Sequence, residues 1–287
     1  MSTYNNPCLS VVIANFNNGK FLNKCLDSII YSNYLNLEVI IIDDGSTDNS
    51  KVNIESKRTD LQKRCNGNVN IIYLVTNVGS GRAKAQALNF VNGKYCCFVD
   101  SDDYVHKDAF SKCIIKFSSD YHLALVYTNA IKIDASNNKL GLLNYAKDGI
   151  DMLHDKVGFH LAVWSMEHYK KLKERFNAKL QIAYDIDLYM KLEEVGNTYF
   201  IDEPLYYYRV HDNNISIGFD KLGNAYAERV ISRWEAQKRR NLDNIKFLGD
   251  ELQSVFNKIK EQNLSKKNIL KRVIHKIMRS THKLLNK

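Results

Sequence analysis

Short apolar runs alternate with helix-like segments through the first hundred residues, and this alternation constrains the fold more than any other feature. The apolar runs, which are typical of buried strands, span residues 9–14, 37–42, 69–75 and 95–99. Helices are expected between them, over residues 21–31, 52–65 and 82–91. Strands and helices that alternate with short loops predict a parallel, doubly wound α/β sheet.

The order of expected elements changes after residue 103. The further elements are a helix at 108–117, a strand at 123–133, a short apolar segment at 157–164, helices at 167–176 and 186–195, and strands at 198–201 and 204–211. From residue 224 onward the pattern is almost wholly helical. The second half is therefore expected to be a different structural unit, joined continuously to the first.

Acidic clusters follow two of the expected strands. Asp100-Ser101-Asp102-Asp103 comes after the run at 95–99, and Asp43-Asp44 comes after the run at 37–42. A parallel sheet brings such strand ends to one edge, where ligands bind in open α/β sheets. Crowded carboxylates repel one another, and a divalent cation held by oxygen ligands relieves that repulsion. The clusters predict a metal-diphosphate site beside a base or ribose site, with turn and helix-cap roles for Asp and Ser as the alternative.

Positive charge is concentrated at the C-terminus. The segment 264–287 carries eight Lys or Arg and no acid, so residues 1–263 hold only +1 of the net charge of +9. Its apolar residues recur at helical spacing, and a basic amphipathic helix is typical of membrane-surface elements. We expect this segment to bind an anionic membrane surface. The alternative is that it packs on the body of the protein or on a second subunit of a homo-oligomer. No nucleic acid is expected, because no aromatic interleaving or RNA-binding motif accompanies the charge.

Cysteine usage favours a cytoplasmic protein, and the basic segment 264–287 favours a place at the inner face of the cell membrane. The six cysteines are scattered without a Cys-x-x-Cys pair, a spacing that suits neither zinc nor a disulfide framework. Residues 1–7 lack the charged and apolar regions of a signal peptide. No stretch approaches 18 apolar residues, so no transmembrane helix is expected.

Several segments resemble glycosyltransferase family 2, in the family's order. Those of the first half are 9–17, 42–48, 77–79, 93–95 and 98–103. Later, Tyr184-Asp185-Ile186-Asp187-Leu188 resembles the family's Glu-Asp-x-Asp-Leu segment, and residues 203–211 resemble its closing motif. The resemblance extends from residue 9 to about residue 216.

This resemblance implies a GT-A fold, with a Rossmann-like, mostly parallel sheet flanked by helices. Residues 1–218 would form the catalytic domain, with a nucleotide-sugar half to about residue 104 and an acceptor half from about 105, and residues 219–287 a helical extension. It also implies an inverting, hexosyltransferase-type reaction from a nucleotide-sugar, usually UDP-linked, aided by Mn²⁺ or Mg²⁺. The acceptor would be a glycan or lipid-linked hydroxyl in bacterial surface polysaccharide synthesis.

The resemblance assigns site residues by position. The nucleotide-sugar would meet Asn15, Asp43, Asp44, Arg82, Lys84, Asp100 and Ser101. The metal would be bound directly by Asp102, with Asp100 and His211 as further candidates. Lys84-Ala85 stand where the family often has Arg-Asn, which passes the diphosphate contact to Lys84 or Arg82. His211 has the alternative of a surface loop histidine, and Arg209 either pairs with the diphosphate or stabilises the loop.

An inverting displacement needs a base that deprotonates the acceptor hydroxyl. Asp185 matches the family's base, although it also stands where a helix N-cap would, and Asp187 is interpreted as a structural or secondary acid. Trp164 and Tyr184 are candidate acceptor contacts. An aromatic face can stack on a sugar ring, and the alternative for Trp164 is a place in the core.

Two other classes of protein remain as alternatives: another phosphate enzyme, either a sugar nucleotidyltransferase or an Asp-nucleophile phosphatase, and a non-catalytic membrane module. A sugar nucleotidyltransferase would want an early Gly-rich loop with Arg and Lys, which residues 15–20 lack. An Asp-nucleophile phosphatase would want its Asp-x-Asp after the first strand, whereas here it follows the fourth. A non-catalytic membrane module would have no need of Asp102 and Asp185 together.

Overall fold

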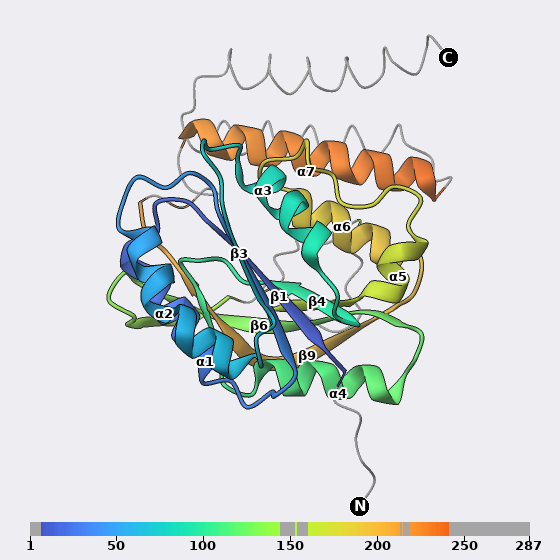
Figure 1. Cartoon of the computed structure of the whole chain (residues 1–287). Helices are drawn as coiled ribbons and strands as arrows, with labels where there is room; N and C mark the ends of the chain where they lie inside the picture. The colour runs from blue at the N-terminus through green and yellow to red at the C-terminus, as the bar shows by residue number, and fades with distance from the viewer. Residues whose placement is uncertain (1–6, 144–152, 154–159, 213, 215–218, 241–287) are drawn as a thin grey trace, which may run out of the picture.

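The computed structural model describes residues 7–143, 153, 160–212, 214 and 219–240. Within these ranges one nine-stranded sheet has the order β3-β2-β1-β4-β8-β6-β9-β5, and β7 pairs with β6. The strands are β1 (Leu9–Asn15), β2 (Leu37–Asp43), β3 (Val69–Tyr73), β4 (Tyr95–Phe98), β5 (Tyr104–Val105), β6 (Leu123–Ile133), β7 (Lys139–Leu142), β8 (Ala162–Ser165) and β9 (Asn197–Arg209). Figure 1 shows the sheet between two groups of helices.

The helices divide between the two faces of the sheet. They are α1 (Gly19–Ile30), α2 (Ser50–Arg64), α3 (Ser80–Ala87), α4 (Ala109–Ser119), α5 (Met166–Lys171), α6 (Tyr184–Glu193) and α7 (Phe219–Arg239), with a 3₁₀ turn at Leu88–Phe90. One core contains side chains of α1, α2 and α4, and the other contains side chains of α3, α5, α6 and α7. The sheet is thus the middle of three layers.

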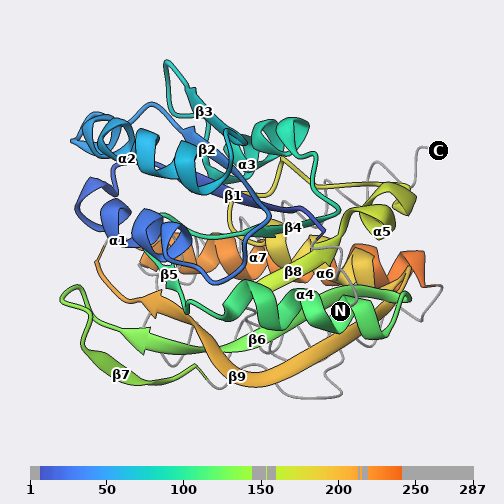
Figure 2. The same ribbon diagram turned by 60° about the horizontal axis from the view of Figure 1, so that its bottom comes forward.

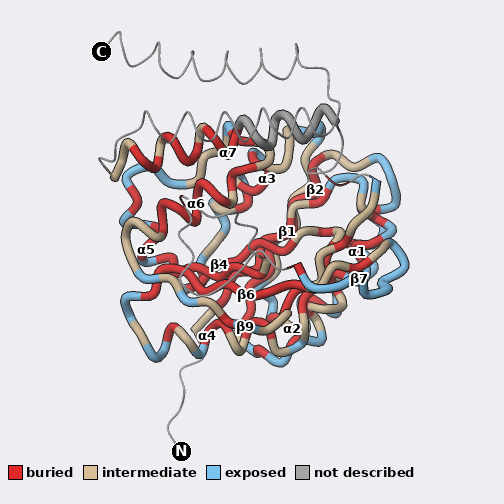
Figure 3. The backbone as a smooth tube through the Cα atoms, turned by 180° about the vertical axis from the view of Figure 1, so that it is seen from behind, coloured by how far each residue is buried: buried red, intermediate tan, exposed pale blue. Residues whose placement is uncertain are grey.

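Alternate residues of the central strands enter different cores. In β1, Val11 and Ile13 pack with α1, α2 and α4, whereas Val12 packs on the opposite face. This period of two follows from the pleat of a strand, and an apolar run without polar positions results because both faces are covered. Each fully buried Val or Ile contributes about 1.5–3 kcal/mol of transfer free energy. Figure 3 shows the buried residues concentrated in these central strands.

The first four strands of the chain, β1 to β4, pair in parallel, as predicted. β1 pairs with β2 and β4, and β2 pairs with β3, all in parallel. β8 then joins β4 to β6 with antiparallel pairing on both sides, while β6 and β9 are again parallel. The sheet is therefore mixed, and it confirms the predicted fold class of a Rossmann-like sheet flanked by helices.

Several predicted elements have different bounds. The strands expected at 198–201 and 204–211 are one strand, β9, which Figure 2 shows curving along β6. Pro204 lies where the β6–β9 register shifts, and a bulge tolerates a residue without an N–H donor. The helix expected to reach residue 176 ends at Lys171, and the apolar segment expected at 157–164 is described only from residue 160. β5 and β7 are short strands that the sequence pattern did not indicate.

The six cysteines all lie in the described ranges, and all six are free. None of the helices in those ranges is long and apolar enough to cross a lipid bilayer. The basic segment 264–287, and most of the predicted extension 219–287, lie outside the described residues.

Candidate active site

The carboxyl ends of β1, β2 and β4 meet at one edge of the sheet. Asn15, the last residue of β1, is the register partner of Asp43, the last residue of β2. β4 pairs with the other side of β1, and Asp100 follows two residues after its end. The parallel topology therefore gathers the two acidic clusters at one edge.

Asn15 and Asp43 form the inner part of this edge. Asn15 Nδ2 donates to Asp43 Oδ1 at 2.7 Å, and the hydroxyl of Ser46 donates to the same oxygen at 2.6 Å. Asn15 Oδ1 is buried and has no hydrogen-bond partner within the described part of the chain. An unpaired buried acceptor is costly, so Asn15 Oδ1 is suited to a donor group of a ligand.

Asp44 has a different role from Asp43. Its two carboxylate oxygens accept the backbone N–H groups of Val78 at 2.7 Å and Gly79 at 2.9 Å, and only 2% of its surface is exposed. Gly79 has a φ of +92°, a conformation that favours glycine. Asp44 therefore fixes the turn that leads into α3, and its carboxylate is occupied by that turn.

The three acids of the second cluster have separate partners. Asp100 Oδ1 pairs with Lys84 Nζ at 2.7 Å, and Asp102 Oδ2 lies 2.9 Å from His211 Nε2. Asp103 Oδ1 accepts the backbone N–H of Arg209 at 2.7 Å. Burial, together with the charges of Asp102 and Asp100, raises the pKa of Asp103 well above its ordinary value. Asp103 is thus a buried structural acid, whereas Asp100 and Asp102 lie where a ligand can reach them.

Arg209 supports the acidic loop from below. Its side chain is 1% exposed, and its guanidinium donates to the backbone carbonyls of Asp102 at 2.6 Å and Asp134 at 2.9 Å. The end of β9 in turn places His211 beside Asp102, with its ring 4.9 Å from that of Phe21. Of the two predicted roles of Arg209, the structure supports stabilisation of the loop.

Lys84 is the cation of the site. It is 2% exposed, and its Nζ donates to Asp100 and, at 2.9 Å, to the Tyr184 hydroxyl. Burial lowers the pKa of Lys84, but Asp100 and Tyr184 outweigh burial and raise it above its ordinary value. Burial likewise opposes ionisation of Asp100, but Lys84 outweighs it and lowers the pKa of that carboxyl. Both groups are therefore charged at neutral pH.

Arg82 and Ser101 were also predicted to contact the nucleotide-sugar, but neither lines the pocket described below. Arg82 is exposed on α3. Ser101 is 1% exposed, and its hydroxyl oxygen accepts Asn18 Nδ2 at 3.0 Å. Of the two alternative cations, Lys84 is the one that the structure brings to the acids.

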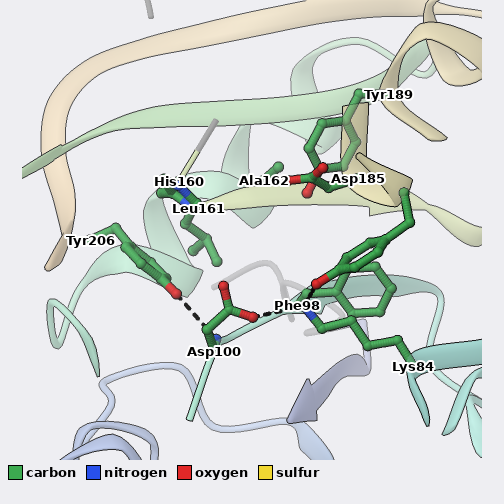
Figure 4. Close-up of a pocket in the computed structure, with 10 residues that line it drawn as sticks. Lys84, Phe98, Asp100, His160, Leu161, Ala162, Asp185, Tyr189 and Tyr206 are labelled. Carbon is green, nitrogen blue, oxygen red and sulfur yellow. Dashed lines mark hydrogen bonds and ion pairs between the residues drawn. The ribbon is translucent and has the colours of Figure 1, made fainter. Parts of the chain in front are cut away.

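A pocket connects the acidic edge to α6 (Figure 4). Its lining consists of Lys84, Phe98, Asp100, His160, Leu161, Ala162, Tyr184, Asp185, Tyr189 and Tyr206. Asp185 lies in the first turn of α6, whose N-cap is Ala183, so Asp185 is not the helix cap. Burial raises the pKa of Asp185, against the opposing effects of the Ile186 N–H and the nearby His160 and Lys84. A raised pKa makes a carboxylate a stronger base.

His160 is the pocket residue that the sequence analysis missed. Its ring stacks between Tyr206 and Tyr208, with centroid distances of 5.2 and 5.0 Å. Burial lowers its pKa, although Asp100 and Asp185 act in the opposite direction. A neutral imidazole can both donate and accept a hydrogen bond. No spacing in the sequence identified it, because its neighbours in the pocket come from β4, α6 and β9.

The position of Trp164 contradicts the prediction that it contacts the acceptor. It is 0% exposed, and its ring packs against Phe98 at 4.8 Å and Tyr189 at 6.5 Å. β8 pairs with β4 and β6 along its two edges, and all 4 of its residues are buried, so both of its faces are covered. The indole is a core residue and has no face available for a sugar. Tyr184, the second candidate, does line the pocket.

The donor set at the edge fits a hard divalent cation with two protein ligands. Asp102 and His211 supply a carboxylate oxygen and an imidazole nitrogen at 2.9 Å from each other, and Mg²⁺ sites commonly use one or two protein carboxylates plus substrate phosphates. Among the described residues no group of three or more His, Cys, Asp or Glu side chains converges on one point. The third predicted ligand, Asp100, is paired with Lys84 instead.

Comparison with known proteins places this geometry in a family. The chain has a TM-score of 0.65 to *S. aureus* TarS 1–349 in complex with UDP, over 91% of this chain and 73% of that one at 20% identity. It has a TM-score of 0.61 to a *Pyrobaculum calidifontis* mannosyltransferase in complex with GDP-Man and Mn²⁺, over 83% and 65% at 16% identity. These similarities show the GT-A fold. The family model for glycosyl transferase family 2 matches residues 10–180.

The chain belongs to glycosyl transferase family 2, which confirms the predicted family and enzyme class. A curated relative, a hyaluronan synthase from *Pasteurella multocida*, is 27% identical over 264 residues. That alignment covers 89% of this chain and 26% of the relative. The chain therefore spans about a quarter of the length of this relative.

Proposed function

We propose that this chain transfers a hexosyl group, with inversion, from a UDP-sugar to a hydroxyl of a glycan or lipid-linked acceptor in bacterial surface polysaccharide synthesis. The observation that carries the proposal is a pocket lined both by Asp100, at the acidic edge of the sheet, and by Asp185 on α6. The similarity to a hyaluronan synthase and to a TarS structure with UDP supports it. The reaction breaks the bond from the sugar carbon to the UDP oxygen and forms one to the acceptor oxygen.

The nucleoside end of the donor would bind at Asn15 and Asp43. The buried, unpaired Asn15 Oδ1 can accept the N3–H of uracil, and Asp43 holds the Asn15 amide in that orientation. Asp44 contributes indirectly, because it fixes the turn before α3. Asp100, which follows β4 at the same edge, can accept a ribose or sugar hydroxyl.

The diphosphate would lie between Lys84 and the Asp102–His211 pair. Asp102 and His211 would hold Mn²⁺ or Mg²⁺, which when bound neutralises charge on the diphosphate leaving group. Lys84 adds a fixed positive charge that burial keeps close to the pocket. Such charges favour the departing UDP because they are already oriented before the reaction.

Asp185 would accept the proton of the acceptor hydroxyl as that oxygen attacks the sugar carbon. Its place in the first turn of α6 directs it to the pocket rather than to the helix end. His160 lines the same pocket as Asp100 and Asp185, where its neutral ring can orient a hydroxyl of donor or acceptor.

The proposal predicts metal-dependent turnover of a UDP-sugar. The full chain, incubated with a panel of UDP- and GDP-sugars and a mixed glycan acceptor, is expected to release UDP with Mn²⁺ or Mg²⁺ and to lose this activity with EDTA. Restoration by added metal is the control for chelator damage. Absence of both UDP-sugar binding and turnover in the presence of Mn²⁺ would contradict the proposal.

We further propose that residues 1–218 form a GT-A domain, whose two halves meet at about residue 104, and that residues 219–287 form an extension.

The basic segment 264–287 would bind an anionic membrane surface on the cytoplasmic side, because it carries eight cationic side chains and no acidic ones. Packing on the body or in a homo-oligomer remains the alternative.

Vesicle flotation tests the membrane proposal. The full chain is expected to float with vesicles that contain anionic lipid and to lose most of this binding without residues 264–287, since each basic residue near the surface contributes about 1 kcal/mol. Neutral vesicles are the control. Equal binding of both chains to anionic vesicles would contradict a role for the segment, and dimerisation lost on truncation would favour the packing alternative.

A further inference from the structure

The loop at residues 180–183, directly ahead of α6, is held by a residue of α7. Glu228 Oε2 accepts the backbone N–H groups of Gln181 at 2.9 Å, Ile182 at 2.8 Å and Ala183 at 3.1 Å. Glu228 is 2% exposed, and α7 lies alongside α6 (Figure 1). A single carboxylate oxygen thus receives three successive backbone donors, in charge-assisted hydrogen bonds that are stronger than neutral ones.

The other side of this loop presses against the turn that begins α3. A Cβ atom added to Gly81 would overlap the Leu180 carbonyl oxygen, and one added to Gly79 would overlap the Gln181 side chain. Asp44 fixes the same turn through Val78 and Gly79. The loop is therefore clamped between a turn anchored at the nucleotide edge of the sheet and the carboxylate of Glu228.

The start of α6 has no capping side chain of its own. Its N-cap is Ala183, which makes no side-chain hydrogen bond, although Ser, Thr, Asp and Asn are the residues that usually fix a helix start. The Asp185 carboxylate accepts the N–H of its neighbour Ile186 at 2.8 Å, a contact within its own turn. The position of Asp185 in the pocket consequently depends on how the loop at 180–183 is held.

We propose that Glu228 is a positioning residue that orients Asp185 by holding the backbone of residues 181–183. This inference rests on the proposed role of Asp185 as the base, and it adds a residue of α7 to the functional unit. Loss of the carboxylate oxygen would leave three buried donors to find new partners and would shift the first turn of α6. A misplacement of about 1 Å is enough to lower a rate by about 10²-fold.

The test uses the full chain with four substitutions. Glu228→Leu removes the acceptor, Glu228→Asp withdraws it by one methylene, and Glu228→Gln keeps an oxygen that can accept the three amides. Glu194→Gln is the matched control, because Glu194 accepts from Arg239 and Arg240 at the far end of the same two helices. Amide hydrogen exchange of the loop peptide and steady-state kinetics with a UDP-sugar are measured for each.

Exchange at residues 181–183 is expected to accelerate in Glu228→Leu and Glu228→Asp, with kcat lowered about 10²-fold and the donor KM nearly unchanged. Glu228→Gln is expected to retain most of the wild-type protection from exchange and most of the wild-type kcat. Glu194→Gln is expected to change neither the exchange of the loop nor kcat. If Glu228→Leu does not fold, Glu228→Asp decides. Unchanged exchange, an unchanged kcat in Glu228→Asp, or an equal loss in Glu194→Gln would overturn the inference. Faster loop exchange in Glu228→Leu and Glu228→Asp, together with no sugar transfer by the wild type, would refute the proposed function but not the clamp.

Discussion

Asp185→Asn is expected to remove nearly all sugar transfer while leaving UDP binding intact. The amide keeps the size of the side chain and an oxygen for the Ile186 N–H, but it cannot accept the proton of the acceptor hydroxyl. Positioned general bases contribute about 10²–10⁴-fold to a rate, so kcat should fall by that factor. Calorimetry with UDP and Mn²⁺, beside steady-state rates, separates the two effects.

The pH dependence gives an independent check on the same residue. Burial raises the pKa of Asp185, and the ionised carboxylate is the active form of a base. The rate should therefore fall as the pH is lowered through this raised pKa, above the range of an ordinary aspartate. The acid limb should be absent from the residual activity of Asp185→Asn.

Asp120→Asn serves as the control, because Asp120 is an acid at the surface that accepts the N–H of His122 away from the pocket. It should keep the wild-type rate and acid limb. Full transfer activity in Asp185→Asn would transfer the role of base to another pocket residue, for which His160 is the candidate.

The parallel half of the fold could be predicted because each of its signals is local. Val11, Val12 and Ile13 show an uninterrupted apolar run because both faces of β1 are covered. The acids at 43 and 100 follow directly from the ends of such runs, so the topology alone brought them together. These parts of the site required no knowledge of side-chain packing.

The roles of individual acids depend on contacts between residues far apart in the sequence. Asp103 is structural because it receives the N–H of Arg209, 106 residues away, and Asp44 because it binds a turn 34 residues on. Sequence alone treats Asp43 and Asp44 as near equivalents, and only the resemblance to the family singled out Asp102 over Asp103. Only the fold separates the acids that face a ligand from those that support the backbone.

The burial of single aromatic and charged residues could not be predicted from the sequence either. Trp164 has the same local sequence whether or not other side chains cover its face of β8, and its packing against Phe98 and Tyr189 decides that it is core. His160 and Glu228 belong to no motif, yet one lines the pocket and the other accepts backbone N–H groups of the loop ahead of α6, the helix that carries Asp185. Their importance arises from β4, α6, α7 and β9 meeting in space.

Asp102→Asn is expected to remove metal-dependent binding of UDP and most of the activity. The Asp102–His211 pair supplies the two donors that the structure places together at the acidic edge, and an amide is a weaker ligand that carries no charge. A metal acting as a Lewis acid contributes several kcal/mol, which corresponds to a loss on the order of 10²–10³-fold. Calorimetric titration of Mn²⁺ in the presence of UDP provides a readout that is independent of turnover.

Asp103→Asn, one residue away, is the matched control for Asp102→Asn. Its amide oxygen can still accept the Arg209 N–H, and burial already raises the pKa of Asp103 and disfavours its charge. This variant should keep both the Mn²⁺ affinity and the rate, because its side chain is turned into the core rather than to the ligand. Equal losses in the two variants would mean that the loop as a whole, and not the Asp102 carboxylate, supports metal binding. Loss confined to Asp102→Asn would assign the metal to the pair with His211, and His211→Ala should then weaken Mn²⁺ binding in the same assay.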